Sequence, residues 1–196
     1  MAEEYKMMRT GKIIVGVTGA SGMPILVKCL ELIREAGYTS ELIVSRHAES
    51  TLDAETKLSV EQLKALANAV YPPEEIGACP ASGTYRTDGM LIVPCSMKTV
   101  AGICSGYSDN LILRAADVTI KEARPLVLAA RETPLSPIHL RNMHELSLIP
   151  GVRIIPPMMT FYHGPESIEE MTYHIAAKLL EPFGIEAKEY RRWKGI

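Results

Sequence analysis

The sequence lacks the cysteine and histidine patterns that bind structural metals or build disulfide frameworks. Its four cysteines, Cys29, Cys79, Cys95 and Cys104, form no C-x-x-C pair, and its five histidines show no spacing that suits zinc. These absences argue against a zinc domain and against a small disulfide-stapled secreted domain. We therefore expect reduced thiols, no metal site, and the cytoplasm as the compartment.

Long apolar runs and an excess of charge of one sign are also missing. No stretch reaches the roughly 18 apolar residues of a membrane-spanning helix. Lys and Arg number 21 against 23 Asp and Glu, and this net charge of −2 argues against a general nucleic-acid binder. Met1–Gly11 has no apolar signal core, so we predict a flexible segment over 1–11 and one domain over 12–196.

Three catalytic motifs are absent as well. The sequence contains no G-x-S-x-G elbow, no G-x-x-x-x-G-K-[ST] loop, and no D-D-x-x-D cluster of the kind that holds magnesium and diphosphate in isoprenoid enzymes. The second absence argues against ATP hydrolysis. The third means that lysine and arginine side chains must neutralise any phosphate that the protein binds.

What the sequence does contain is a regular alternation of strand and helix signals. Five nearly continuous apolar segments are typical of buried parallel strands: Ile13–Val17, Glu41–Val44, Met90–Val93, Leu126–Ala130 and Val152–Ile155. Helix-start signals open the intervening segments. They are Pro24 after Gly22, Ser59 with Gln62 before Val60–Val70, Ser136-Pro137 before Ile138–Leu148, and Ser167 with Glu170 before Ile168–Leu180. The alternation predicts a doubly wound α/β domain, with loops over 71–89, 131–136 and 156–165.

Two small-residue turns follow predicted strands and are suited to phosphate. The first is Lys12–Gly22, a strand that runs through Gly16, Gly19 and Gly22 into a helix, where bare backbone N–H groups can hold an anion. Its G-x-x-G-x-x-G spacing differs from the dinucleotide G-x-G-x-x-G and is weak alone. The second is Pro94-Cys95-Ser96-Met97-Lys98-Thr99. Together they suggest one nucleotide at the carboxyl edge of a parallel sheet.

Further polar residues are expected at the same edge. Ser21 and Ser45 follow strands, and each can contact a ligand or cap a helix. Arg131 and Glu132 follow the strand Leu126–Ala130, where they form either a phosphate clamp with an acid–base group or a surface ion pair. Tyr162 either bonds a phosphate or covers the edge of the core.

Taken in order, these segments resemble the UbiX-type flavin prenyltransferases, including the phenolic acid decarboxylase B subunits. The resemblance spans Lys12–Trp193. Its motifs are Val17–Gly22, Leu42–Ser45, Glu55, Pro94–Thr99, Asp109–Leu111, Arg114–Asp117, Lys121-Glu122, Arg131–Leu135, Ile138–Leu140, Phe161–His163 and Arg191–Trp193. It implies a Rossmann-like (flavodoxin-like) single domain, a dodecamer, and metal-independent transfer of a dimethylallyl group from dimethylallyl phosphate to N5 and C6 of reduced FMN. The prenylated FMN would serve a UbiD-type decarboxylase.

The resemblance also implies roles for particular residues. FMN contacts are expected from Gly19, Ala20, Ser21, Ser45, Ser96, Met97, Lys98, Thr99 and Arg131, and contacts to the donor phosphate from Lys121, Arg131, Tyr162 and Lys178. Glu132, Ser21 and Glu55 are the expected catalytic residues. Lys178 stands where many relatives have arginine, and Ile76 stands near a position where several have tryptophan.

Two other functions use the same fold. A flavin-dependent cysteine decarboxylase typically carries a catalytic histidine near the second strand, where His47 lies, but its P-x-M-N signature is absent. A non-catalytic flavin carrier or decarboxylase subunit would use the same FMN contacts. It would have no use for a second phosphate site.

Overall fold

The structure is a computed structural model that describes residues 11–193 and 195. Positions 1–10 of the segment expected to be flexible lie outside the described residues. Gly11 is buried, and its carbonyl accepts a hydrogen bond from the Thr39 amide (2.8 Å). Ordered structure therefore begins no later than Gly11.

A six-stranded parallel sheet forms the centre, in the order β3-β2-β1-β4-β5-β6. The strands are β1 (Lys12–Val17), β2 (Thr39–Val44), β3 (Ala69–Tyr71), β4 (Gly89–Cys95), β5 (Leu126–Ala130) and β6 (Val152–Ile154). The helices are α1 (Met23–Glu35), α2 (Arg46–Glu55), α3 (Val60–Lys64), α4 (Met97–Cys104), α5 (Leu111–Lys121), α6 (Pro137–Ser147) and α7 (Ile168–Leu180), with short 3₁₀ turns η1 (Cys79–Ala81) and η2 (Glu181–Phe183). The predicted doubly wound α/β fold is confirmed.

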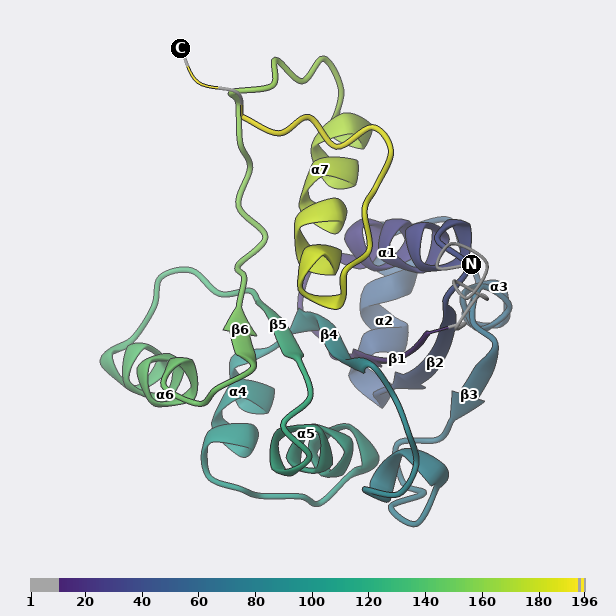
Figure 1. The fold of residues 1–196 in the computed structure, drawn as a ribbon, viewed down its shortest axis with the longest axis vertical. Helices are drawn as coiled ribbons and strands as arrows, with labels where there is room; N and C mark the ends of the chain where they lie inside the picture. Colours follow the sequence, from purple (N-terminus) through teal and green to yellow (C-terminus); the bar gives the residue numbers. More distant parts are fainter. Residues whose placement is uncertain (1–10, 194, 196) are drawn as a thin grey trace, which may run out of the picture.

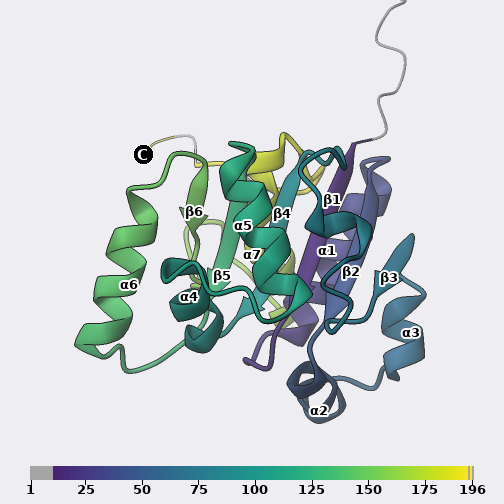
Figure 2. The ribbon, with the colours of Figure 1, turned by 90° about the horizontal axis from the view of Figure 1, so that it is seen from below.

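Successive strand residues point to opposite faces, so each face of the sheet has its own core. Ile13, Val15 and Val17 of β1 pack with α1, α2, α3 and α7, whereas Ile14 packs with α4, α5 and α6. Figure 2 shows α4, α5 and α6 in front of the sheet and α1 and α7 behind it. With both faces covered, the residues that can meet a ligand lie at the strand ends.

The C-terminal part departs from this compact arrangement. After β6 the chain rises away from the sheet to the start of α7, and the tail after η2 runs back along α7 to the same end (Figure 1). The first of these segments is the loop predicted over 156–165. Among the described residues, no helix is long and apolar enough to cross a membrane.

Two local predictions were wrong. The helix expected over Val60–Val70 ends at Lys64. The Asn68 amide donates to the Ser40 carbonyl (2.9 Å), and the Asn68 side-chain oxygen accepts from the Ser40 amide (2.9 Å). The β-favouring Val70 and Tyr71 then extend the sheet as β3. The capping box expected at Ser167 is only half formed. Ser167 accepts from the Glu170 amide, but the Glu170 carboxylate accepts from Glu166 instead.

Candidate functional site

The direction in which the strand order grows reverses between β1 and β4, and ligands of open parallel sheets bind outside the carboxyl ends at such a point. Here a single side chain ties the two strand ends together. The Thr18 hydroxyl donates to the Pro94 carbonyl (2.8 Å) and accepts from the Ser96 amide (2.9 Å). The two turns that the sequence marked as phosphate-suited therefore meet at one place.

The first turn differs from the expectation of bare N–H groups. The Glu55 carboxylate, at the end of α2, accepts from the amides of both Gly22 (2.8 Å) and Met23 (2.9 Å) at the N-terminus of α1. A carboxylate already occupies the place where a phosphate would sit, as the positive end of the helix dipole favours. Partial burial opposes ionisation, but hydrogen bonds from the Ser21 hydroxyl and these two amides, with the charge of Arg131, leave the pKa of Glu55 lowered.

The second turn remains open to an anion. Ser96 caps α4 by accepting from the Thr99 amide (3.4 Å), and the Val100 amide bonds to the Ser96 carbonyl (3.0 Å). The amides of Met97 and Lys98, as the first two of the helix, have no carbonyl one turn earlier to bond to. The Lys98 side chain is exposed above them. This helix start offers two N–H groups and a cation to a phosphate.

The residues between the two turns are small, and their backbone packs closely against the start of α2. A side chain at Gly19 would come within 2.7 Å of the His47 Cβ atom, so only glycine fits there. Ser45 lies at the N-cap of α2, but its hydroxyl makes no capping bond. Ala20 follows in a turn held by the bond from its amide to the Thr18 carbonyl (2.9 Å). Ser21 and Ser45 are thus at the expected edge, and the Ser45 hydroxyl is not used as a cap.

Arg131 and Glu132 complete this edge. The Arg131 amide donates to the Cys95 carbonyl (3.0 Å), which fixes the end of β5 beside β4. The positive charge of Arg131 contributes to the lowered pKa of Glu55. Glu132 is exposed, and its carboxylate accepts from the Thr133 amide (3.0 Å). The chain therefore gathers the expected FMN contacts and all three expected catalytic residues along one edge.

The chain does not gather the four residues expected at the donor phosphate. Lys121 ends α5 and precedes β5, whereas Arg131 follows β5, so the length of the strand, roughly 16 Å, lies between them. Lys121 is ion-paired with Glu122 (2.6 Å) and lines a hollow of about 510 Å³ with Arg86 and Arg124. Lys121 thus lies at the amino ends of the parallel strands and Arg131 at their carboxyl ends.

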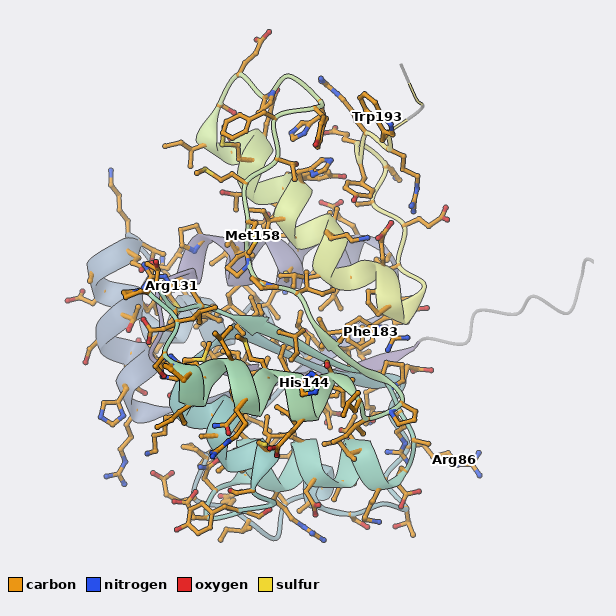
Figure 3. The ribbon with its side chains drawn as sticks, turned by 90° about the vertical axis from the view of Figure 1, so that its left-hand side faces the viewer. Arg86, Arg131, His144, Met158, Phe183 and Trp193 are labelled. Carbon is orange, nitrogen blue, oxygen red and sulfur yellow. The ribbon has the colours of Figure 1, made fainter. Side chains whose placement is uncertain are left out.

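Tyr162 and Lys178 also lie away from Arg131. Tyr162 is 82% exposed on the segment after β6, and its ring lies 5.3 Å from that of Trp193. Figure 3 shows Trp193 at the far end of the C-terminal projection and Arg131 near the sheet. Lys178 is paired with Glu181 (2.6 Å), one turn before Phe183, whose ring packs against Gly89 at the start of β4. One copy of the chain therefore holds the pieces of this second site apart.

Comparison with known proteins shows the family of the chain. The sequence pattern of the family described as Flavoprotein matches residues 1–179. A probable UbiX-like flavin prenyltransferase of Streptomyces sp. (strain D7) is 49% identical over 186 residues, which cover 94% of this chain and 92% of that protein. The chain belongs to the UbiX-like flavoprotein family.

Two solved structures of family members are similar over nearly the whole chain. A dodecameric FMN-dependent UbiX-like decarboxylase from Escherichia coli O157:H7 has a TM-score of 0.91 and 47% identity, covering 94% of this chain and all of that one. AnUbiX (PadA1), in complex with FMN and dimethylallyl pyrophosphate, has a TM-score of 0.93 and 42% identity, covering 96% of this chain and all of that one. The fold is thus shared with two flavoproteins.

Sequence reasoning missed Thr18 as a site residue. It lies inside the first turn motif, and no spacing rule marks it, because its importance comes from a bond to a turn 76 residues away. The available signal was that Thr18 is the last polar residue before the glycine turn and directly follows a buried strand.

Proposed function

We propose that this chain is a flavin prenyltransferase. It joins the dimethylallyl group of dimethylallyl phosphate to N5 and C6 of reduced FMN, and its prenylated product serves a UbiD-type decarboxylase. The observation that carries the proposal is the open anion site at α4, tied by Thr18 to the sheet edge at which Ser21, Glu55 and Arg131 lie. Relatives named flavin prenyltransferase, such as LpdB of Lactiplantibacillus plantarum at 49% identity, support it.

The residues present fit FMN. The open helix start at α4 supplies the Met97 and Lys98 amides, with Lys98, Ser96 and Thr99 side chains around them, for the phosphate. Gly19 and Ala20 are small residues beside which a flat ring system would lie, and Ser21, Ser45 and Arg131 offer polar groups along its edge. Reduced FMN supplies the nucleophilic N5 and C6 atoms when bound.

The donor phosphate requires more than one copy of the chain. Lys121, Tyr162 and Lys178 lie apart from Arg131, and no rotation of side chains crosses the roughly 16 Å length of β5. We propose that neighbouring copies bring these groups together, in a dodecamer like that of the Escherichia coli relative. The exposed Tyr162 and Trp193 lie where a neighbour can reach them.

Each residue then has a defined task. Lys121, Arg131, Tyr162 and Lys178 bind the donor phosphate, and the cations stabilise the charge that develops on it as it leaves, without a metal ion. Losing Arg131 is expected to cost about 100-fold in rate. Glu132 takes the proton released from C6. Ser21 relays a proton to or from the phosphate, and Glu55 holds Ser21 in place through the hydrogen bond between them.

Two further properties belong to the proposal. The four free cysteines of the described chain suit the reducing cytoplasm, which we propose as the compartment. A carrier that only binds FMN remains the alternative, because its contacts would be the same. The donor phosphate residues distinguish the two functions.

The deciding experiment mixes the protein, reduced FMN and dimethylallyl phosphate without oxygen and measures the mass of the flavin product by mass spectrometry. A flavin heavier by one five-carbon unit is expected, and Arg131→Ala should abolish most of it. A chelator should leave the turnover unchanged. Unmodified FMN that is bound but never prenylated would refute the enzyme and favour the carrier.

A further inference from the structure

Two histidines that the proposed chemistry does not use lie beside Tyr162. The rings of His163, on the segment after β6, and His174, on α7, stack face to face with centroids 3.9 Å apart and an interplanar angle of 5°. Figure 1 shows the rising segment and the tail coming together near the start of α7. The stack therefore joins the segment after β6 to α7.

His174 bonds to both of those segments. Its Nδ1 lies 3.3 Å from the Thr160 hydroxyl, and its Nε2 lies 3.3 Å from the Arg191 carbonyl. A carbonyl only accepts, so we assign the proton of the neutral ring to Nε2, which leaves Nδ1 to accept from Thr160. The neutral ring satisfies both partners.

Two hydrogen bonds hold the backbone on either side of Tyr162. The Gly164 amide donates to the Phe161 carbonyl (3.0 Å), and Arg191 donates to the His163 carbonyl (3.0 Å). The tail also brings Trp193 to 5.3 Å from the Tyr162 ring. The direction in which the Tyr162 hydroxyl points therefore depends on the contact between the segment after β6, α7 and the tail.

The surroundings of His163 favour its uncharged form. Both ring nitrogens are buried, and neither has a hydrogen-bond partner within residues 11–193. Burial, the neighbouring His174 and the charge of Arg191 lower the pKa of His163 from its ordinary value near 6.5, and Glu170 acts in the opposite direction. The hollow of about 480 Å³ beside the two rings is also lined by Lys28 and Glu35 of α1, Glu169 of α7, and Lys188 and Glu189 of the tail.

We propose that the stacked His163–His174 pair positions the Tyr162 hydroxyl for the phosphate of the prenyl donor, and does so only while His163 is uncharged. A proton on His163 would place positive charge against the face of His174 and beside Arg191, so the stack opens and Tyr162 loses its support. The proposal rests on the proposed function, because it takes Tyr162 as a contact to the donor phosphate. The pair are positioning residues.

The kinetic test measures KM for dimethylallyl phosphate and kcat at about pH 7.5, well above the ordinary histidine pKa. His174→Ala is expected to raise KM about tenfold, as Tyr162→Phe does, with kcat within about twofold. The double variant should be no worse than Tyr162→Phe alone, because both changes remove the same contact. Additive losses, or an unchanged KM in His174→Ala, would overturn the proposal.

A second readout does not depend on the reaction. Trp193 is the one tryptophan of the chain, so its emission reports on the contact with Tyr162. As the pH falls below about 6.5, the wild-type emission should shift to the red. His163→Phe, which keeps a flat ring but cannot take a proton, should abolish the shift.

The matched control is His144→Gln, a change in the exposed histidine of α6 (Figure 3), which should behave as wild type. A red shift of the emission in acid that persists in His163→Phe would refute the pH-dependent positioning of Tyr162 by the histidine pair. If the wild type forms no prenylated FMN, the proposed function fails. The emission experiment still decides whether protonation of His163 releases the contact between Tyr162 and Trp193.

Discussion

The cap that Glu55 places on α1 allows a prediction with a calculable size. Its carboxylate receives the Gly22 and Met23 amides, at 2.8 and 2.9 Å, from a helix 32 to 33 residues earlier in the chain. Losing a helix cap costs about 0.5–2 kcal/mol, and losing a negative charge at a helix start costs about 0.3–1 kcal/mol more. Glu55→Ala, which loses both, should therefore lower the free energy of unfolding by about 2 kcal/mol.

Glu55→Gln separates the two contributions. The amide oxygen can still accept from one or both N–H groups, so only the charge is lost and the expected cost is about 1 kcal/mol near pH 7. For a domain of this size, that corresponds to a fall of about 2–4 °C in Tm. Urea unfolding measures the change in the free energy of unfolding. It is done at one fixed protein concentration and without FMN, because bound ligand and assembly would both add stability.

The pH dependence gives the sharper test. The pKa of Glu55 is lowered in the folded chain, so its contribution is fully present above the unfolded value near 4.5 and is lost as the pH falls through the lower folded value. The deficit of Glu55→Gln should thus shrink toward zero in acid. Asp53→Asn, an exposed change on the same helix, should stay within about 0.5 kcal/mol throughout. A Glu55→Gln deficit that is absent at pH 7, or that persists unchanged in acid, would refute the charged cap.

Three further predictions concern the carboxyl edge of the sheet and the donor site. Thr18→Val leaves the Ser96 amide without its acceptor, although the Pro94 carbonyl keeps its bond from the Thr18 amide (3.3 Å). Urea unfolding should therefore show a loss of about 1–3 kcal/mol, and an FMN titration should show a weaker affinity; an unchanged midpoint would contradict the bridge. Glu132→Gln should bind FMN normally yet form prenylated FMN about 100-fold more slowly or worse in single-turnover assays, and a normal rate would exclude Glu132 as the proton carrier. Lys178→Ala should reduce kcat/KM for the donor by about tenfold, whereas Arg131→Ala should reduce it by about 100-fold. The smaller effect is expected because lysine is a point charge and Lys178 is already paired with Glu181. Equal losses in kcat/KM would contradict this ranking of the two cations.

The arrangement of the sheet could be predicted because local signals decide it. Leu126–Ala130 and the helix Ile168–Leu180 were predicted at their observed ends, and Ser59 with Gln62 forms the expected capping box. The strand Ala69–Tyr71 was missed because three residues carry no period of their own. Its identity comes from pairing with β2, which a local pattern does not record.

The site was predictable where its residues follow strands, and not where it depends on contacts across the chain. Ser21, Ser45, Ser96 and Arg131 were placed at the carboxyl edge by their position after strands, and the structure puts them there. That Glu55 would fill the start of α1 is a contact over more than 30 residues, which no motif spacing reveals. The same holds for the histidine stack that joins the segment after β6 to α7.

The placement of Lys121 and Arg131 at opposite ends of the parallel strands has a genetic consequence. If each donor site draws these two cations from different copies, a chain lacking Lys121 and a chain lacking Arg131 are defective in complementary ways. An assembly of one variant alone lacks one cation in every donor site. A mixed assembly of Lys121→Ala and Arg131→Ala subunits contains some interfaces at which both cations are present. Two inactive alleles expressed together should thus regain part of the activity that neither has separately.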